Sequence, residues 1–319
     1  KAILLLSGGL DSLLAGRLVI DQGIELEALN FVTIFCNCTS RGSCKHEATR
    51  ASENLGIPLS VVNVSEEYLE VIKNPKHGYG SSINPCIDCR IFMFRKAKEH
   101  MEKTGASFIV TGEVLGERPM SQRRHTMEII EKESGLQDFI VRPLCAKLFP
   151  PSYPEREGIV ARGKFLSLRG RARKDQIKLA EKLSLKDYPC PSGGCLLADK
   201  IFGEKMKDLI KYRSLNLKNA VLLKLGRHFR LSESVKLIVG RDEAENNSLI
   251  NLSKSPDIIL ETVDIAGPVS VITGREARDF VEVASRVAAR YSDSPEDKNT
   301  GFVWYEKGSS EKNYLVSLP

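Results

Sequence analysis

Residues 7–12 have the sequence Ser-Gly-Gly-Leu-Asp-Ser and carry the clearest chemical signal in the chain. They follow an apolar run, residues 2–6, that is typical of a buried parallel strand, and they precede a helical pattern. Gly8 and Gly9 let the backbone turn tightly around an anion, to which the helix start offers free N–H groups. Asp11 would repel a bare phosphate, so it predicts a Mg²⁺ ion that bridges phosphates. We interpret the segment as a phosphate-binding loop; the alternative is an ordinary strand–helix turn capped by Ser or Asp.

Cysteines give the second signal. Of the eight, seven fall into three groups along the chain, which are Cys36, Cys38 and Cys44, then Cys86 and Cys89, then Cys190 and Cys195. The first apolar run is too short for a signal peptide, so we expect a cytoplasmic protein with reduced thiols. Grouped cysteines in that setting favour metal, cluster or redox chemistry. We interpret the isolated Cys145 as a small buried hydrophobe.

The phosphate-loop sequence resembles the signature of the PP-loop ATP pyrophosphatases, also called the adenine nucleotide α-hydrolase-like superfamily. The resemblance implies an enzyme that splits ATP between its α and β phosphates. Such an enzyme adenylates a carbonyl oxygen and releases pyrophosphate, and a nucleophile then displaces AMP. The loop lacks the Gly-Lys-Ser/Thr end of the kinase-type P-loop, so transfer of the γ-phosphate is disfavoured.

Two further stretches resemble tRNA thiolation enzymes of this class. Asn84-Pro-Cys-Ile-Asp-Cys89, followed at a distance by Gly194-Cys195, is similar to the tRNA 2-thiouridylases. Thr111-Gly-Glu-Val-Leu-Gly116, followed by Ser121-Gln122, is similar to the tRNA 4-thiouridine synthetases. The resemblance implies that catalysis depends on Asp11, Cys89 and Cys195. The residues that it assigns to ATP are Ser7, Gly8, Gly9, Leu10, Asp11, Ser12, Thr111 and Gly112.

Cys86 and Cys89 stand at the expected start of a helix, where the helix dipole should lower the pKa of a thiol. Three kinds of chemistry remain open for them. With Cys195 they could bind three irons of a [4Fe–4S] cluster, leaving the fourth iron to bind the transferable sulfide. One cysteine could instead carry a persulfide while another resolves a disulfide. A structural zinc ion with Cys190 as fourth ligand is the third alternative. Sulfide or a persulfide-carrying protein would supply the sulfur.

Two other polar patterns are candidates for binding. The spacing Cys36-x-Cys38-x₅-Cys44-x-His46 permits a zinc site, and the alternative is a loop with incidental cysteines. Clustered arginines would neutralise phosphates in a tRNA enzyme, and the alternative is a solvated charged face. The arginines assigned to RNA are Arg123, Arg124, Arg171, Arg173, Arg227 and Arg230.

Strands alternating with helices predict a doubly wound parallel sheet, an α/β fold, over residues 1–215. The expected strands are residues 2–6, 26–32, 58–64, 106–111 and 139–142. The expected helices are residues 10–22, 44–55, 87–103, 171–183 and 200–212. Residues 143–165 are rich in proline and irregular.

The pattern changes near residue 218 to short strands, which predicts a smaller α+β domain over residues 216–319. Its expected strands are residues 221–225, 234–239, 258–263 and 269–273, followed by a helix at 276–291 and a hairpin of 302–305 with 314–318. Gly226-Arg-His-Phe-Arg230 is interpreted as a basic hairpin tip with an aromatic ring that can stack on RNA. With residues 239–246 it is faintly similar to an RNA-binding domain of ribosome-associated quality-control factors. The alternative is an appended stabilising domain.

Length and composition limit the classes of protein. The chain has 319 residues, 42% of them hydrophobic, and a net charge of +6, which suits two folded domains and weakly favours a polyanionic partner. No apolar run is long enough to cross a membrane. The phosphate loop, the grouped cysteines and the resemblance that they carry imply a tRNA sulfurtransferase that uses ATP and Mg²⁺. The rivals are a PP-loop synthase that joins ammonia to a small deazaguanine or nucleotide substrate, and an RNA-binding regulator with a vestigial nucleotide site. The oligomeric state and the modified base stay open.

Overall fold

A five-stranded parallel sheet with the order β3-β2-β1-β4-β5 forms the centre of the N-terminal half. The computed structural model describes residues 1–36, 44–185, 188, 194–263, 265–294 and 298–317. The five strands are β1 (Ala2–Leu5), β2 (Leu26–Val32), β3 (Leu59–Asn63), β4 (Ile109–Thr111) and β5 (Ile140–Val141). The α/β class with a parallel sheet is thereby confirmed.

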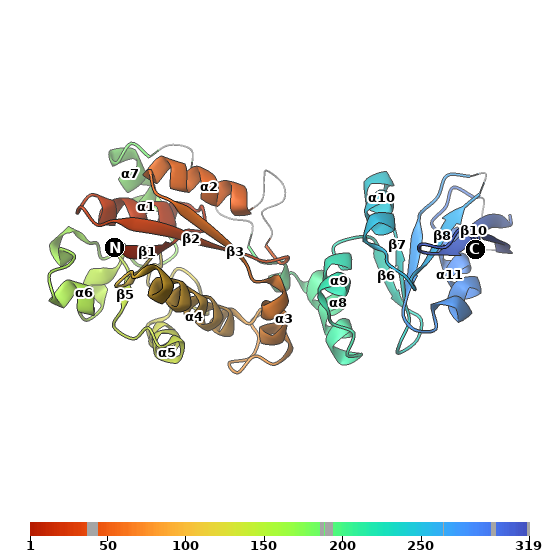
Figure 1. Cartoon of the computed structure of the whole chain (residues 1–319), viewed down its shortest axis with the longest axis horizontal. Coiled ribbons are helices and arrows are strands. Elements are labelled where there is room, and N and C mark those ends of the chain that lie inside the picture. Colours follow the sequence, from red (N-terminus) through yellow and green to blue (C-terminus); the bar gives the residue numbers. More distant parts are fainter. Residues whose placement is uncertain (37–43, 186–187, 189–193, 264, 295–297, 318–319) are drawn as a thin grey trace. The chain divides into compact units, whose positions relative to one another are not determined.

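Helices cover both faces of this sheet (Figure 1). Because side chains alternate along a strand, Ala2 and Leu4 of β1 pack on one face and Ile3 on the other. The first face is covered by α1 (Leu10–Ile20), α2 (Cys44–Leu55) and α7 (Lys174–Lys182). The second face is covered by α4 (Cys86–Thr104) and α5 (Arg124–Ser134), and a further helix is α3 (Ser65–Lys73). Burial on both faces explains why β1 is continuously apolar.

The strand order reverses between β1 and β4, and ligands of open α/β sheets bind at the carboxyl ends of strands at such a point. The segment after β1 is the expected phosphate loop, and the segment after β4 begins with Gly112. These two segments touch, because a Cβ atom on Gly112 would lie 2.5 Å from the backbone of Asp11 and Ser12. Only glycine permits this approach.

Most expected elements of this half agree with the structure, and β2 and α2 have the expected bounds. Helices α3 and α5 were not predicted from the sequence. Helix α5 is held by the burial of Met127 and Ile130. The irregular segment contains short helices only, which are η1 (Ala146–Leu148), α6 (Tyr153–Arg156) and η2 (Arg162–Lys164); η3 (Leu196–Ala198) follows α7.

The C-terminal half contains an antiparallel sheet with the order β11-β10-β8-β9-β7-β6. Its strands are β6 (Arg227–Arg230), β7 (Lys236–Val239), β8 (Ile258–Thr262), β9 (Ser270–Thr273), β10 (Thr300–Glu306) and β11 (Asn313–Ser317). Its helices are α8 (Lys200–Lys211), α9 (Leu217–Leu222), α10 (Glu243–Leu252), η4 (Ala277–Phe280) and α11 (Val281–Ala289). One core joins α11 to the sheet, and a second lies under α9 and α10. This is the expected α+β arrangement.

Two expectations for this half are wrong. Residues 221–225 are not a strand, because α9 occupies residues 217–222 and the side chain of Asn216 caps it by accepting from the Asn219 N–H at 2.8 Å. Residues 226–230 are not a hairpin tip either. They lead into the edge strand β6, which pairs with β7, so the turn of this hairpin lies at residues 231–235. The expected hairpin of β10 with β11 is confirmed.

The chain divides into two compact units, Lys1–Lys200 and Ile201–Pro319. We expected residues 201–215 with the first domain, whereas α8 contacts the second. Lys205 donates to the Leu223 carbonyl at 3.2 Å, and Asp208 accepts from Arg230 on β6. In the part of the chain that the structure describes, no helix is long and apolar enough to cross a membrane.

Changing Gly112 to Ala should destabilise the first unit by about 3 kcal/mol, because the added methyl group overlaps the start of α1. Thermal unfolding of both proteins measures this. Gly163→Ala is the matched control, since no heavy atom lies within 4 Å of a Cβ there. Equal stability of the two variants would contradict the close approach.

Candidate active site

The loop after β1 is arranged to receive an anion. Gly8 has φ +82°, and its missing Cβ would lie 2.7 Å from the backbone of Glu47, so the loop fits closely against α2. Gly9 is the N-cap of α1, and among the described residues no side chain caps this helix. The hydroxyl of Ser12 donates to the Gly9 carbonyl at 2.8 Å, and Ser7 lies 3.3 Å from Ser12. The first turn of α1 therefore presents N–H groups and two hydroxyls at the sheet edge.

Two carboxylates lie beside this loop. Asp11 is in the first turn of α1 and Glu117 follows β4, and their carboxyl groups interact directly. Burial raises the pKa of Asp11, and the charges of Arg173 and Arg118 only partly offset it. Burial and the nearby Asp11 raise the pKa of Glu117. Asp11 Oδ1 and Glu117 Oε2 are buried and have no donor among the described residues. Such oxygen ligands suit Mg²⁺, so this pair fits the ion that Asp11 alone suggested.

Glu117 was missed from the sequence, although it lies five residues after the assigned Gly112. Arg173 was assigned to RNA, yet the structure places its guanidinium 3.5 Å from Asp11. A parallel bridge between Leu115 and Arg169, with the Gly170 N–H donating to the Leu115 carbonyl at 2.8 Å, brings the two segments together. Arg173 therefore lies beside the loop that follows β1, and its assignment to RNA stays a prediction.

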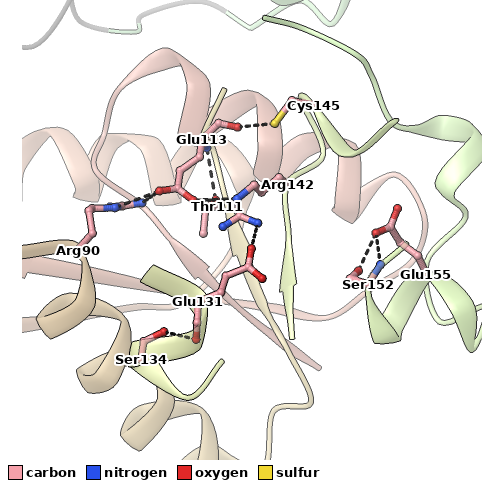
Figure 2. Close-up of polar contacts among 9 residues, drawn as sticks. All are labelled: Arg90, Thr111, Glu113, Glu131, Ser134, Arg142, Cys145, Ser152 and Glu155. Atoms are coloured by element: carbon pink, nitrogen blue, oxygen red, sulfur yellow. Dashed lines mark hydrogen bonds and ion pairs between the residues drawn. The ribbon is translucent and has the colours of Figure 1, made fainter. Parts of the chain in front are cut away.

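The carboxylate of Glu113 joins three elements at this edge of the sheet (Figure 2). It accepts from Arg90 of α4 at 2.6 Å, from Arg142 after β5 at 3.0 Å and from Thr111 of β4 at 3.2 Å. Arg142 also pairs with Glu131 of α5. Burial would raise the pKa of Glu113, but the guanidinium groups of Arg90 and Arg142 outweigh it and lower that pKa.

Four cysteines lie within electrostatic reach of one another. Cys86 and Cys89 are in the first turn of α4, and Cys86 Sγ accepts from Asn84 Nδ2 at 3.1 Å. Cys36 and Cys195 form an antiparallel bridge, in which the Leu196 N–H donates to the Phe35 carbonyl at 3.0 Å. The pKa of Cys89 depends on Cys86 and Cys36, and the pKa of Cys195 depends on Cys89, Cys36 and Cys86. We expected Cys36 in a separate zinc group, and the structure places it with Cys86, Cys89 and Cys195.

The expected lowering of the Cys89 pKa is wrong. Burial raises the pKa of Cys89 to about 11, despite a hydrogen bond to Tyr68 and the charge of Arg90. Cys195 is exposed, and its pKa is raised to about 12 by partial desolvation of the thiol and by the neighbouring thiols. Desolvation of a thiolate therefore outweighs the helix dipole at this site. Both thiols are protonated at neutral pH unless a metal or a reaction partner takes the proton.

The structure describes only some of the residues of the two predicted zinc sites. Cys38 and Cys190 lie outside the described residues, and the side chain of Cys44 does too, whereas His46 is exposed. Within the described part, no group of three or more His, Cys, Asp or Glu side chains is arranged to hold a metal ion. Cys145 is fully buried as expected, and its Sγ donates to the Glu113 carbonyl at 3.2 Å.

The remaining arginines assigned to RNA differ in exposure and in their contacts. Arg123 and Arg171 are exposed. Arg124 lies over the Phe149 ring and donates to the Leu148 carbonyl, and Arg227 lies over the Tyr291 ring. Arg230 pairs with Asp208. Their role in RNA binding stays a prediction.

A glycine-rich loop at the reversal point of a parallel sheet, beside a buried carboxylate pair, is the arrangement by which α/β domains bind nucleotides. Residues 1–147 match the family described as thiamine biosynthesis protein (ThiI). Residues 226–318 match the family described as the NFACT protein RNA binding domain. The resemblance to PP-loop tRNA thiolation enzymes is confirmed, and so is the fainter one in the second unit.

The chain is also similar to curated proteins that are named as tRNA sulfurtransferases and tRNA-specific 2-thiouridylases. The probable tRNA sulfurtransferase of Streptococcus suis is 32% identical over 148 residues, covering 45% of this chain and 34% of that protein. The one from Anoxybacillus flavithermus is 29% identical over 198 residues, 53% of this chain and 49% of that protein. The tRNA-specific 2-thiouridylase MnmA of Syntrophotalea carbinolica is 30% identical over 114 residues, 34% of this chain and 32% of that protein. The chain thus spans a third to a half of these relatives.

A solved 4-thiouridine synthetase–RNA complex with bound ATP aligns with a TM-score of 0.38 and 22% identity, over 70% of this chain and 52% of that one.

Glu113→Gln should lower the stability of the protein by about 3 kcal/mol, because two guanidinium groups lose their buried counter-charge. The lowered pKa of Glu113 means that its contribution is complete above the unfolded pKa of about 4.3 and is lost as pH falls further. Chemical denaturation between pH 3 and pH 8 tests both points. Glu128→Gln, at an exposed position on α5, is the control. If the Glu113 variant were as stable as this control, the stabilising role of the Glu113 contacts with Arg90 and Arg142, here called the Glu113 clamp, would be contradicted.

Mild oxidation of the apo protein with diamide should link Cys36 to Cys195. Their bridge is of the non-hydrogen-bonded kind, in which opposite Cα atoms are about 4.5 Å apart, within disulfide range. Peptide mass spectrometry identifies the link. It should vanish in Cys36→Ser and persist in Cys145→Ser, and a dominant link between Cys89 and Cys195 would contradict the pairing.

Proposed function

We propose that the chain is an ATP-dependent tRNA sulfurtransferase, which replaces a uridine carbonyl oxygen with sulfur. One observation carries the proposal: Glu113 joins the helix of Cys86 and Cys89 to β4, and the glycine that follows β4 touches the phosphate loop. Arg90 is adjacent to Cys89, and Thr111 is adjacent to Gly112. Sulfur-handling thiols and a nucleotide site are thus built on the same rigid edge.

In the proposed reaction, Mg·ATP binds with its phosphates at residues 7–12. Asp11 and Glu117 hold the Mg²⁺ ion, and Arg173 neutralises phosphate charge. The target uridine leaves its stack so that its carbonyl oxygen can reach the α-phosphate. That oxygen attacks phosphorus, and pyrophosphate leaves. Holding the two reactants in line lowers the entropic part of the barrier.

The sulfur step has two forms. Cys86, Cys89 and Cys195 have the donor chemistry of [4Fe–4S] ligands, and such a cluster would supply an iron without a protein ligand for the incoming sulfide. In the second form, a persulfide on Cys195 attacks the adenylated carbon and AMP departs. Cys36 then attacks the Cys195 sulfur, which releases the thiolated base and leaves a Cys36–Cys195 disulfide for a dithiol to reduce. The antiparallel bridge between these two cysteines supports this form.

We assign RNA binding to the second unit and expect the reaction in the cytoplasm, where thiols stay reduced. The sulfur donor is sulfide or a persulfide-carrying protein.

Nucleoside mass spectrometry of tRNA from anaerobic cells with and without the gene tests the function, since one thiolated nucleoside should disappear. In vitro, tRNA should stimulate the release of pyrophosphate from ATP. Release without tRNA dependence would favour a small-molecule synthase, and binding of ATP without release would favour a regulator. Full thiolation in the deletion strain, without a second enzyme that covers the loss, would refute tRNA thiolation.

Variants separate the two half-reactions. Asp11→Asn and Glu117→Gln should each reduce pyrophosphate release at least about 100-fold, because the ion loses a ligand. Their melting temperatures should be unchanged or higher, since each removes a buried, poorly compensated charge. Cys195→Ser should keep pyrophosphate release and lose thiolation. Iron and acid-labile sulfide in protein purified anaerobically distinguish the cluster from the persulfide.

A further inference from the structure

We propose that a cavity in the second unit binds one nucleotide of an RNA strand through its phosphate. The assignment of RNA as the source of this nucleotide rests on the proposed function. The cavity itself lies wholly within residues 209–275 and has a volume of about 510 Å³. Ligand sites of this size commonly hold small molecules or single nucleotides. The end of α8, the start of α9 and strands β6, β7 and β9 surround it.

The inner wall of the cavity holds cations in fixed positions. Lys236 is buried, and it donates to Asp208 at 2.9 Å. Arg230 donates to the same carboxylate at 2.5 Å, and its guanidinium stacks 4.6 Å from the centre of the Tyr212 ring. One carboxylate thus serves two cations, so the wall keeps excess positive charge. His228 is neutral here, because burial and nearby lysines lower its pKa to about 3.

The rim adds two cations of a different kind. Arg213 and Arg275 are exposed, and neither forms an ion pair with any residue that the structure describes. Glu233 is the acidic residue that lines the cavity. Four cations therefore face this cavity against the carboxylates of Asp208 and Glu233. A phosphate is the group that such a wall and rim would attract, with arginine forks reaching its oxygens.

The backbone at Arg213 supports a binding role for its side chain. Arg213 has φ +49°, in the left-handed region, directly after α8 and Tyr212. Glycine is the residue that usually takes this position after a helix, because other residues are strained there. The chain has arginine instead. Arginine brings a charge to the rim where glycine would be more stable; Ser184 has a similar φ of +54° after α7, so the support comes from the place of Arg213 at the cavity and not from its backbone alone.

Asn216 and Asn219 also line the cavity. Asn216 Oδ1 accepts from the Asn219 N–H, and Asn219 Nδ2 donates to the Ser214 carbonyl, so the amide groups left to pair with the edge of a base are Asn216 Nδ2 and Asn219 Oδ1. A phosphodiester with its attached base thus matches both the cations and the amide side chains that line the cavity. A compact inorganic anion would use the cations only.

The test compares Arg213→Gly with the unchanged protein. Removal of the strain should keep or raise the melting temperature, whereas loss of a phosphate contact should weaken tRNA binding about eightfold at 0.1 M salt. The slope of log affinity against log salt should fall by about one. Arg275→Gln should act similarly. Arg286→Gln, an exposed arginine of α11 outside the cavity, is the charge-matched control and should lose much less.

Fluorescence anisotropy with labelled tRNA and with a short single-stranded oligoribonucleotide gives the affinities, and AMP is titrated in parallel. Equal binding by Arg213→Gly, Arg275→Gln and Arg286→Gln would overturn the proposal. Tight AMP binding that depends on Arg213, without an effect on RNA, would overturn the assignment to RNA and identify a free-nucleotide site. Failure of the thiolation assays with retained Arg213-dependent RNA binding would refute the enzyme activity alone.

Discussion

The Glu113 carboxylate between Arg90 and Arg142 is the interaction on which the first unit depends. A buried carboxylate is costly unless its charge is paired, and here two guanidinium groups and a hydroxyl provide the pairing. Because the partners of Glu113 come from α4, β4 and the segment after β5, this interaction fixes the relative positions of three elements that are far apart in the sequence. It thereby also fixes the positions of the cysteines at the start of α4 relative to the glycine after β4.

The candidate site collects carboxylates that are unstable without a ligand. Asp11 and Glu117 keep buried oxygens that have no donor among the described residues. Each of these costs folding free energy in the empty protein, and a divalent ion would relieve that cost. Cys89 and Cys195 carry no such cost at neutral pH, because their raised pKa values leave both thiols protonated in the folded chain, as they are in the unfolded chain. The reasoning for the carboxylates applies to Arg213, whose strained backbone stands beside a cavity with excess positive charge.

The two units divide the work in the proposed reaction. The first presents nucleotide and sulfur chemistry on a sheet whose both faces are covered by helices. The second has an antiparallel sheet, matches an RNA-binding family and offers a cationic cavity of nucleotide size. Affinity for RNA comes mostly from phosphate contacts, so a separate basic unit can supply it without crowding the reacting groups.

Local sequence determined much of this protein. The strand–loop–helix string at residues 2–20, the alternating strands and helices, and the Cys-x-x-Cys at the start of α4 all follow from patterns within a short window. Residues 221–225 were misjudged because a short apolar segment with one β-branched residue fits a strand or a helix, and the Asn216 cap decided for the helix.

Tertiary structure decided which distant residues meet. Glu117 reaches Asp11, Arg173 lies beside Asp11 of the phosphate loop, and Cys36 lies opposite Cys195. No spacing rule predicts these pairs, because each depends on the crossover connections that bring the ends of separate strands to one edge. The pKa of the Cys89 thiol is a further example. The sequence predicts its position at a helix start, but the burial that outweighs the helix dipole exists only in the folded chain.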